Sequence, residues 1–338
     1  MSSKTIFSGS DALGLRDPQT RTLSYRSDTR GLAPIACAEQ GLPAATADIL
    51  FKVSSQALGL EGPAFERSGN LLFVDVFGGR VLRLTPDQTL STVYQEDHLH
   101  PAGIAVHKDG RIYLASLGPL KDDVFAAGSV IAINQDGSGR QAIVSPALGY
   151  VIDDLVFDSD GGFYFTDFKG TATSGEGGVY YVSPDSREVV SVLPNLCVAN
   201  GVALSPDGKV LWATEFAASR LHRVELARPG AMARLGSTVP YHFVGRAPDS
   251  MRTDSHGNVY VAMFQQARIL VFSPFGIPIG QILLPGREGN HFLKCTSLAL
   301  LPGSRDLVIV ARDELGDRGA AVFAARGLAE GFPLFSHL

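Results

Sequence analysis

The stretch VANGVALSPDGKVLWATE, residues 198–215, joins a short apolar run, an Asp-Gly turn and a second apolar run that is typical of a β-strand. Glycine suits such a turn because it tolerates the left-handed backbone conformation that tight strand reversals need. The same layout recurs along the chain. The turn glycines that precede a strand-like segment are Gly69, Gly110, Gly161, Gly208, Gly257 and, in a looser copy, Gly303.

Successive turn glycines are separated by 41 to 51 residues. A repeat of about 40–50 residues built from strands is the period of β-propeller blades. Each unit continues into a further strand, as in GRVLRLTPD at 79–87, and sustained helical periodicity is absent between the strands. The sequence therefore predicts an all-β fold, a six-bladed β-propeller spanning residues 46–338 as one domain. Residues 1–45 are expected to form an N-terminal arm, part of which could pair with the last blade and close the ring.

Composition narrows the functional classes. Hydrophobic residues make up 45% of the 338 residues, and 37 glycines and 19 prolines indicate a globular chain with many turns. The formal net charge of −5 argues against a nucleic-acid partner. No apolar stretch approaches the ~18 residues of a membrane span, and the N-terminus does not resemble a secretory signal. We expect a soluble cytoplasmic protein without a membrane partner; the sequence sets no oligomeric state.

Oxygen-bearing residues occupy one shared position in the repeat. The residue eight positions before each turn glycine is, in chain order, Glu61, Ala102, Asp153, Asn200, Asp249 and Cys295. In superimposable blades these positions are equivalent around the central axis, so the three carboxylates and the amide should converge, with Ser250 beside Asp249. Turn-forming Asp and Asn are common for other reasons, but four independent turns need not share one offset.

Converging carboxylates repel one another unless a cation neutralises them. Hard oxygen ligands without His or Cys favour Ca²⁺, with Mg²⁺ and Mn²⁺ as lesser candidates. The sequence therefore predicts a metal site in the central channel, held by Glu61, Asp153, Asn200 and Asp249, with Ser250 as a further contact. No G-x-S-x-G motif is present, which disfavours a serine nucleophile.

These motifs resemble the gluconolactonase, senescence-marker-protein and luciferin-regenerating-enzyme superfamily. The likeness extends from about residue 30 to the C-terminus. It rests on four motifs that follow one another with similar spacing: LEGPAF, VIDDLVFDSDGGFYFTDF, VANGVALSPDGKVLWATE and PDSMRTDSHGNVYVAM. It is strongest to the bacterial drug-responsive lactonase branch, since Asp153 stands where the wider superfamily usually has Asn. The resemblance implies a propeller enzyme that hydrolyses lactones with a catalytic calcium, and it allows a second, structural Ca²⁺.

For such an enzyme the expected reaction is attack of water on a metal-polarised carbonyl of a small-molecule lactone. Asp249 is the candidate general base and Asp153 the alternative. Two other functions remain open: an organophosphate-hydrolysing propeller, and a non-catalytic metal-stabilised binding platform. Among the histidines, His98 and His100 are expected in a solvated loop, whereas His291 could line the pocket or be structural.

Overall fold

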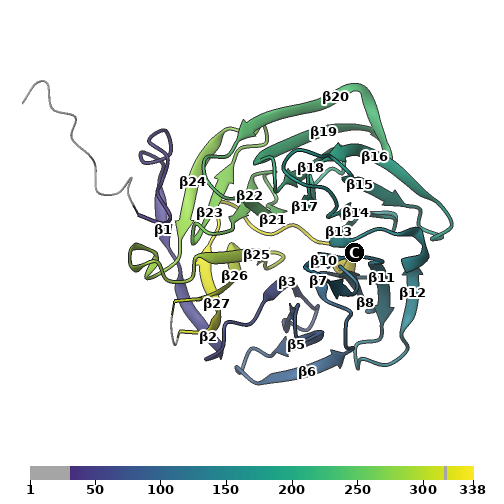
Figure 1. The fold of residues 1–338 in the computed structure, drawn as a ribbon, viewed down its shortest axis with the longest axis horizontal. Coiled ribbons are helices and arrows are strands. Elements are labelled where there is room, and N and C mark those ends of the chain that lie inside the picture. The colour runs from purple at the N-terminus through teal and green to yellow at the C-terminus, as the bar shows by residue number, and fades with distance from the viewer. Residues whose placement is uncertain (1–30, 316–317) are drawn as a thin grey trace, which may run out of the picture.

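Six antiparallel sheets surround a central axis in the computed structural model, which describes residues 31–315 and 318–338 (Figure 1). The predicted six-bladed all-β propeller is confirmed. In every blade the first strand is innermost, and each innermost strand lies against the innermost strand of the next blade. Within the described residues the only helical segments are three short 3₁₀ turns, and no helix is long and apolar enough to cross a membrane.

The blades follow one another along the chain. Blade 1 contains β3 (Leu60–Phe65), β4 (Leu71–Asp75), β5 (Arg80–Leu84) and β6 (Leu90–Gln95). Blade 2 contains β7 (Pro101–Val106), β8 (Ile112–Ser116), β11 (Ser129–Ile133) and β12 (Gln141–Val144). Blade 3 contains β13 (Ile152–Phe157), β14 (Phe163–Asp167), β15 (Gly177–Val182) and β16 (Val189–Leu196). Blade 4 contains β17 (Ala199–Leu204), β18 (Val210–Glu215), β19 (Arg220–Arg228) and β20 (Ala231–His242).

Blade 5 contains β21 (Pro248–Thr253), β22 (Val259–Met263), β23 (Arg268–Phe272) and β24 (Pro278–Leu283). Blade 6 contains β25 (Lys294–Leu300), β26 (Asp306–Arg312) and β27 (Ala320–Arg326). A small hairpin, β9 (Leu120–Lys121) with β10 (Val124–Phe125), extends from blade 2. The 3₁₀ turns are η3 (Pro146–Leu148), η4 (Arg287–Gly289) and η5 (Phe335–His337).

The six turn glycines all have a left-handed backbone. Their φ angles lie between 68° at Gly208 and 92° at Gly161, a region that side chains with a Cβ rarely enter. Each glycine connects the first strand of a blade to its second. The recurrence that was visible in the sequence therefore reflects one backbone requirement repeated in six blades.

Ring closure uses the N-terminal side of the chain. Strand β2 (Asp48–Ser54) pairs antiparallel with β27 as the outermost strand of blade 6, so the last blade combines both ends of the propeller. Just before it, β1 (Ala44–Thr46) adds a parallel strand to β24 of blade 5. The predicted arm, residues 1–45, ends within β1, and its first 30 residues lie outside the described residues.

The segment before β1 is fixed to blade 5 by buried charges. Arg268 is fully buried and donates from Nη2 to the Glu39 carboxylate at 2.5 Å, and its Nη1 donates to Gln281 at 3.0 Å. Tyr241 donates its hydroxyl to the other Glu39 oxygen at 2.5 Å. A buried ion pair of this kind is stable only while every partner remains, because a lone buried charge is costly.

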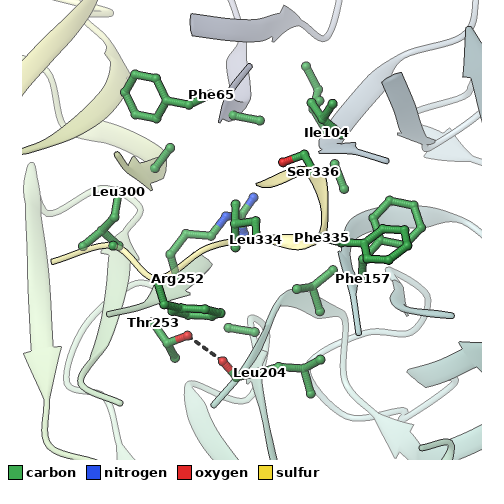
Figure 2. A pocket seen from close by; sticks show the side chains of 18 of the residues that line it. Phe65, Ile104, Phe157, Leu204, Arg252, Thr253, Leu300, Leu334, Phe335 and Ser336 are labelled. Atoms are coloured by element: carbon green, nitrogen blue, oxygen red, sulfur yellow. Dashed lines mark hydrogen bonds between the residues drawn. The ribbon is translucent and has the colours of Figure 1, made fainter. Parts of the chain in front are cut away.

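The apolar core lies between neighbouring blades, where Val74 of blade 1, for example, packs with Ile104 and Leu114 of blade 2. The C-terminal segment then crosses the end of the ring where the innermost strands finish (Figure 1). Figure 2 shows Leu334 and Phe335 lying against Arg252 and Phe157, and a cavity of about 70 Å³ remains beside them. This far end of the ring is therefore largely filled by the protein's own chain.

We predict that Glu39→Gln destabilises the protein by about 3–5 kcal/mol, because the Arg268 charge would stay buried without its carboxylate. Equilibrium urea unfolding measures the change. Asp185→Asn, which removes an exposed carboxylate paired with Arg187 at 3.6 Å, should leave the free energy of unfolding nearly unchanged. Equal effects of the two substitutions would contradict a stabilising role for the buried pair.

Candidate functional site

A β-bulge interrupts each of the six innermost strands at the same level. At that level the register of each inner strand against its neighbour shifts by one residue. Such bulges bend a strand and redirect its side chains. The shifts fall between Glu61 and Ala64, Pro101 and Gly103, Ile152 and Leu155, Ala199 and Val202, Pro248 and Met251, and Cys295 and Ser297.

Of the five residues predicted at the metal site, Glu61 borders the bulge of its strand and the other four lie within theirs. Glu61 is half-buried, whereas Asp153, Asn200, Asp249 and Ser250 are buried. The Ser250 hydroxyl approaches the Glu61 carboxylate at 3.5 Å, which links blade 5 to blade 1 directly. The two remaining blades contribute Ala102 and the buried thiol of Cys295 at this level.

The carboxylates act on one another electrostatically. Burial raises the pKa of Glu61 well above its usual value, and the charges of Asp249 and Asp153 raise it further. Burial and the charge of Asp153 likewise raise the pKa of Asp249. The pKa of Asp153 is raised chiefly by burial and secondly by Asp154. Three acidic groups on three blades therefore share one poorly solvated region at the axis.

The side chain of Asn200 has a hydrogen-bond acceptor that receives no hydrogen bond. Its side-chain oxygen Oδ1 is buried and has no hydrogen-bond partner, which is rare for a buried polar atom. A cation that accepts oxygen ligands would satisfy this atom and the carboxylates together. Within the described residues, no three His, Cys, Asp or Glu side chains by themselves form a metal-holding group. The fit therefore depends on Asn200 and Ser250 as well as on the carboxylates.

Two threonines that the sequence reasoning missed fix the bulges of adjacent blades. The Thr166 hydroxyl accepts a hydrogen bond from the backbone N–H of Asp154 at 3.0 Å and donates one to the carbonyl oxygen of Asn200. In the same way, Thr214 accepts the amide of Gly201 at 2.7 Å and donates to the carbonyl of Asp249 at 2.8 Å. The signal for both was the repeated Thr-acid pair at the end of a second strand, TD at 166–167 and TE at 214–215.

An ion pair below the bulges was also missed. Arg252 donates from Nη1 to the buried carboxylate of Asp154 at 2.8 Å, and the same carboxylate accepts the amides of Leu155 at 2.9 Å and Val202 at 3.4 Å. Arg252 therefore neutralises the fourth acidic group of the region. The charges of Glu61, Asp153 and Asp249 have no such basic partner among the described residues.

The expectation for His100 was wrong. It is buried rather than solvated, because its Nδ1 hydrogen-bonds the carbonyl of Gly118 at 2.9 Å and its ring packs edge-on against Phe125. His98 is exposed, as expected of a solvated loop. His291 is held by Asp313, with 2.8 Å between Nδ1 and Oδ2.

The chain is similar to proteins of one known family. The SMP-30/Gluconolactonase/LRE-like family profile matches residues 60–309. Lactonase drp35 of Staphylococcus saprophyticus is 45% identical over 313 residues, covering 91% of this chain and 95% of that protein. Lactonase drp35 of Staphylococcus aureus strain USA300 is 43% identical over 319 residues, covering 93% of this chain and 97% of the relative.

Solved structures show the same fold at lower identity. A calcium-binding protein, regucalcin, from Agrobacterium tumefaciens superimposes with a TM-score of 0.69 at 17% identity, covering 86% of this chain and 98% of that chain. A gluconolactonase from Xanthomonas campestris gives a TM-score of 0.64 at 20% identity, covering 83% and 96% of the two chains. By its sequence match over most of the propeller, the chain belongs to the SMP-30/gluconolactonase/LRE-like family.

Proposed function

We propose that this protein is a calcium-dependent lactonase, with its site in the bulges of the innermost strands. The observation that carries the proposal is the orphaned Oδ1 of Asn200 beside three mutually repelling carboxylates. The relatives named lactonase, which are 45% and 43% identical over nearly the whole chain, support this class of reaction.

The ion would be held by Glu61, Asp153, Asn200 and Asp249. Ser250 would contact either the ion or the Glu61 carboxylate. An all-oxygen set with three carboxylates and one amide suits Ca²⁺ better than softer metals, and Mg²⁺ or Mn²⁺ are the alternatives. The threonine bridges through Thr166 and Thr214 fix the backbone of these residues, which keeps the oxygens in place when the ion leaves.

Bound calcium would supply positive charge that polarises the lactone carbonyl. Asp249 is the candidate general base, which takes a proton from the attacking water, and Asp153 is the alternative. The thiol of Cys295 has a raised pKa from burial and from Asp249 and Glu61, so it stays protonated and does not compete as a nucleophile. The Asp154–Arg252 pair and the C-terminal segment close the far end, so a lactone would enter from the end where the inner strands begin.

The direct test is hydrolysis of γ- and δ-lactones, dihydrocoumarin, gluconolactone and an organophosphate, with chelator and after calcium is added back. Lactone turnover that is lost with chelator and restored by calcium supports the proposal. Turnover of the organophosphate alone would replace it with phosphotriester hydrolysis. Calcium binding without turnover of any compound would contradict the enzyme and favour a binding platform.

Asp249→Asn and Glu61→Gln should each lower calcium-dependent lactone turnover by about 10²-fold or more, because each removes a charged ligand and Asp249→Asn also removes the base. Both variants should remain folded and should lose most of the rise in melting temperature that calcium gives the wild type. Asp185→Asn is the control and should retain both properties. Unfolding of both site variants in the presence of calcium would instead make the cluster structural.

The stability of the metal-free protein should fall as the pH rises. Unfolded Asp and Glu ionise near pH ~4, whereas the folded-state pKa values of Glu61, Asp153 and Asp249 are raised, so the folded state binds more protons above that pH. The stability that these protonated groups allow at low pH is therefore lost as the pH rises through their raised folded-state pKa values. Calcium should stabilise the protein more at pH ~8 than at pH ~5, because the carboxylates that bind it are then ionised. Thermal unfolding with chelator and with calcium measures this; a calcium effect independent of pH would contradict it.

A further inference from the structure

One ring of residues lines the end of the propeller where the innermost strands begin, and we call it the rim. It consists of the residue that follows the second strand of each blade: Val76, Leu117, Phe168, Phe216, Phe264 and Asp313. The rings of Phe168 and Phe216 are 6.1 Å apart, and those of Phe216 and Phe264 are 5.6 Å apart. The phenylalanines of blades 3, 4 and 5 therefore contact one another in turn around this end of the ring.

Asp313 is the polar exception in this apolar rim. Its carboxylate is fully buried; Oδ2 binds Nδ1 of His291 at 2.8 Å and Oδ1 accepts the amide of Leu315 at 3.1 Å. The His291 side chain remains 25% exposed. Within the described part of the chain its other nitrogen, Nε2, has no hydrogen-bond partner. A protonated imidazole has an N–H on both ring nitrogens, so with Nδ1 bound to Asp313 the Nε2–H is the one left to donate.

The dyad lies at the end of blade 6 where β25 begins, just beyond the level of the candidate metal site. Ala311 pairs with Cys295, whose thiol is affected by the charges of Asp249 and Glu61. Asp313 is two residues beyond Ala311 along the chain, which places it about 7 Å above the level of Cys295. A lactone whose carbonyl faced the bulges would occupy this interval, so its ring oxygen would lie between the carboxylates and His291.

Two of the three basic side chains near the dyad pair with an acid. Lys294 and Arg312 both pair with Glu314, at 3.5 and 3.3 Å, and Lys294 also lies over the ring of Phe264. Arg318 approaches Gly286, which also borders the Cβ of His291. Among the six rim residues, Asp313 of blade 6 is the one whose side chain binds a histidine, His291.

We infer that His291, oriented by Asp313, is the general acid that protonates the leaving oxygen when the lactone ring opens. This inference rests on the proposed function. Water adds its oxygen to the carbonyl carbon and gives a proton to Asp249. The bond between that carbon and the ring oxygen then breaks, and the ring oxygen takes the Nε2 proton of His291. The proton on Asp249 returns to His291 through water, which completes the cycle with a hydroxy acid as the product.

The test uses leaving groups of different basicity. δ-Valerolactone opens to an alkoxide, which needs a proton as it leaves, whereas dihydrocoumarin opens to a phenoxide, whose conjugate acid has a pKa of only about 10. His291→Gln and Asp313→Asn should each lower kcat on δ-valerolactone by about 10²-fold. On dihydrocoumarin the loss should be less than about 3-fold, since a stable leaving group gains little from an acid.

His98→Asn is the matched control, because His98 is an exposed histidine at the same end of the ring, and it should leave both rates unchanged. The calcium-induced shift in melting temperature confirms that each variant is folded, and His291→Asn replaces His291→Gln if that variant fails to fold. An equal loss on both lactones, or no loss on either, would overturn the inference, as would wild-type turnover confined to dihydrocoumarin. Wild-type failure on both lactones would refute the proposed function instead.

Discussion

The pairing of β2 with β27 holds the structure together, because six separate sheets have a common axis only when the ring is closed. Closure places the last innermost strand, β25, against the first, β3, and Thr296 of β25 donates to the carbonyl of Leu60 at 2.7 Å across this junction. Glu61 follows Leu60 directly. The first carboxylate of the candidate site is therefore positioned by the same junction that completes the fold, and the buried Glu39–Arg268 pair fixes the chain that leads into it.

Within the closed ring, local backbone irregularity gathers the residues of the candidate site. A regular strand would send alternate side chains between the blades, whereas the bulges bring Glu61, Asp153, Asn200 and Asp249 to one level at the axis. Burial and the mutual repulsion raise the pKa values of the three carboxyl groups, so their ionisation costs folding free energy. Unfavourable free energy of this kind is typical of a binding site, where a bound ligand removes it.

The fold was readable from the sequence because each blade repeats one strict backbone requirement, the left-handed glycine between its first and second strands. Counting from that glycine also identified the bulge residues, since a constant offset along equivalent strands marks equivalent positions. The bulges themselves were not foreseen, because they are a property of pairing between strands rather than of one segment. The Asp154–Arg252 pair was not predicted for the same reason: it depends on contact between different blades, and its partners are 98 residues apart in the sequence. His100 was misjudged because its burial depends on Phe125 from the β9–β10 hairpin.

The most direct measurement is an anomalous difference map from crystals grown with Mn²⁺ and, separately, with Ca²⁺. We expect one ion at the axis, with oxygens of Glu61, Asp153, Asn200 and Asp249 about 2.1–2.6 Å away and Oδ1 of Asn200 directed at it. An ion bound elsewhere in the ring while this position stays empty, or Asn200 Oδ1 turned to a protein donor in the metal-loaded crystal, would contradict the account.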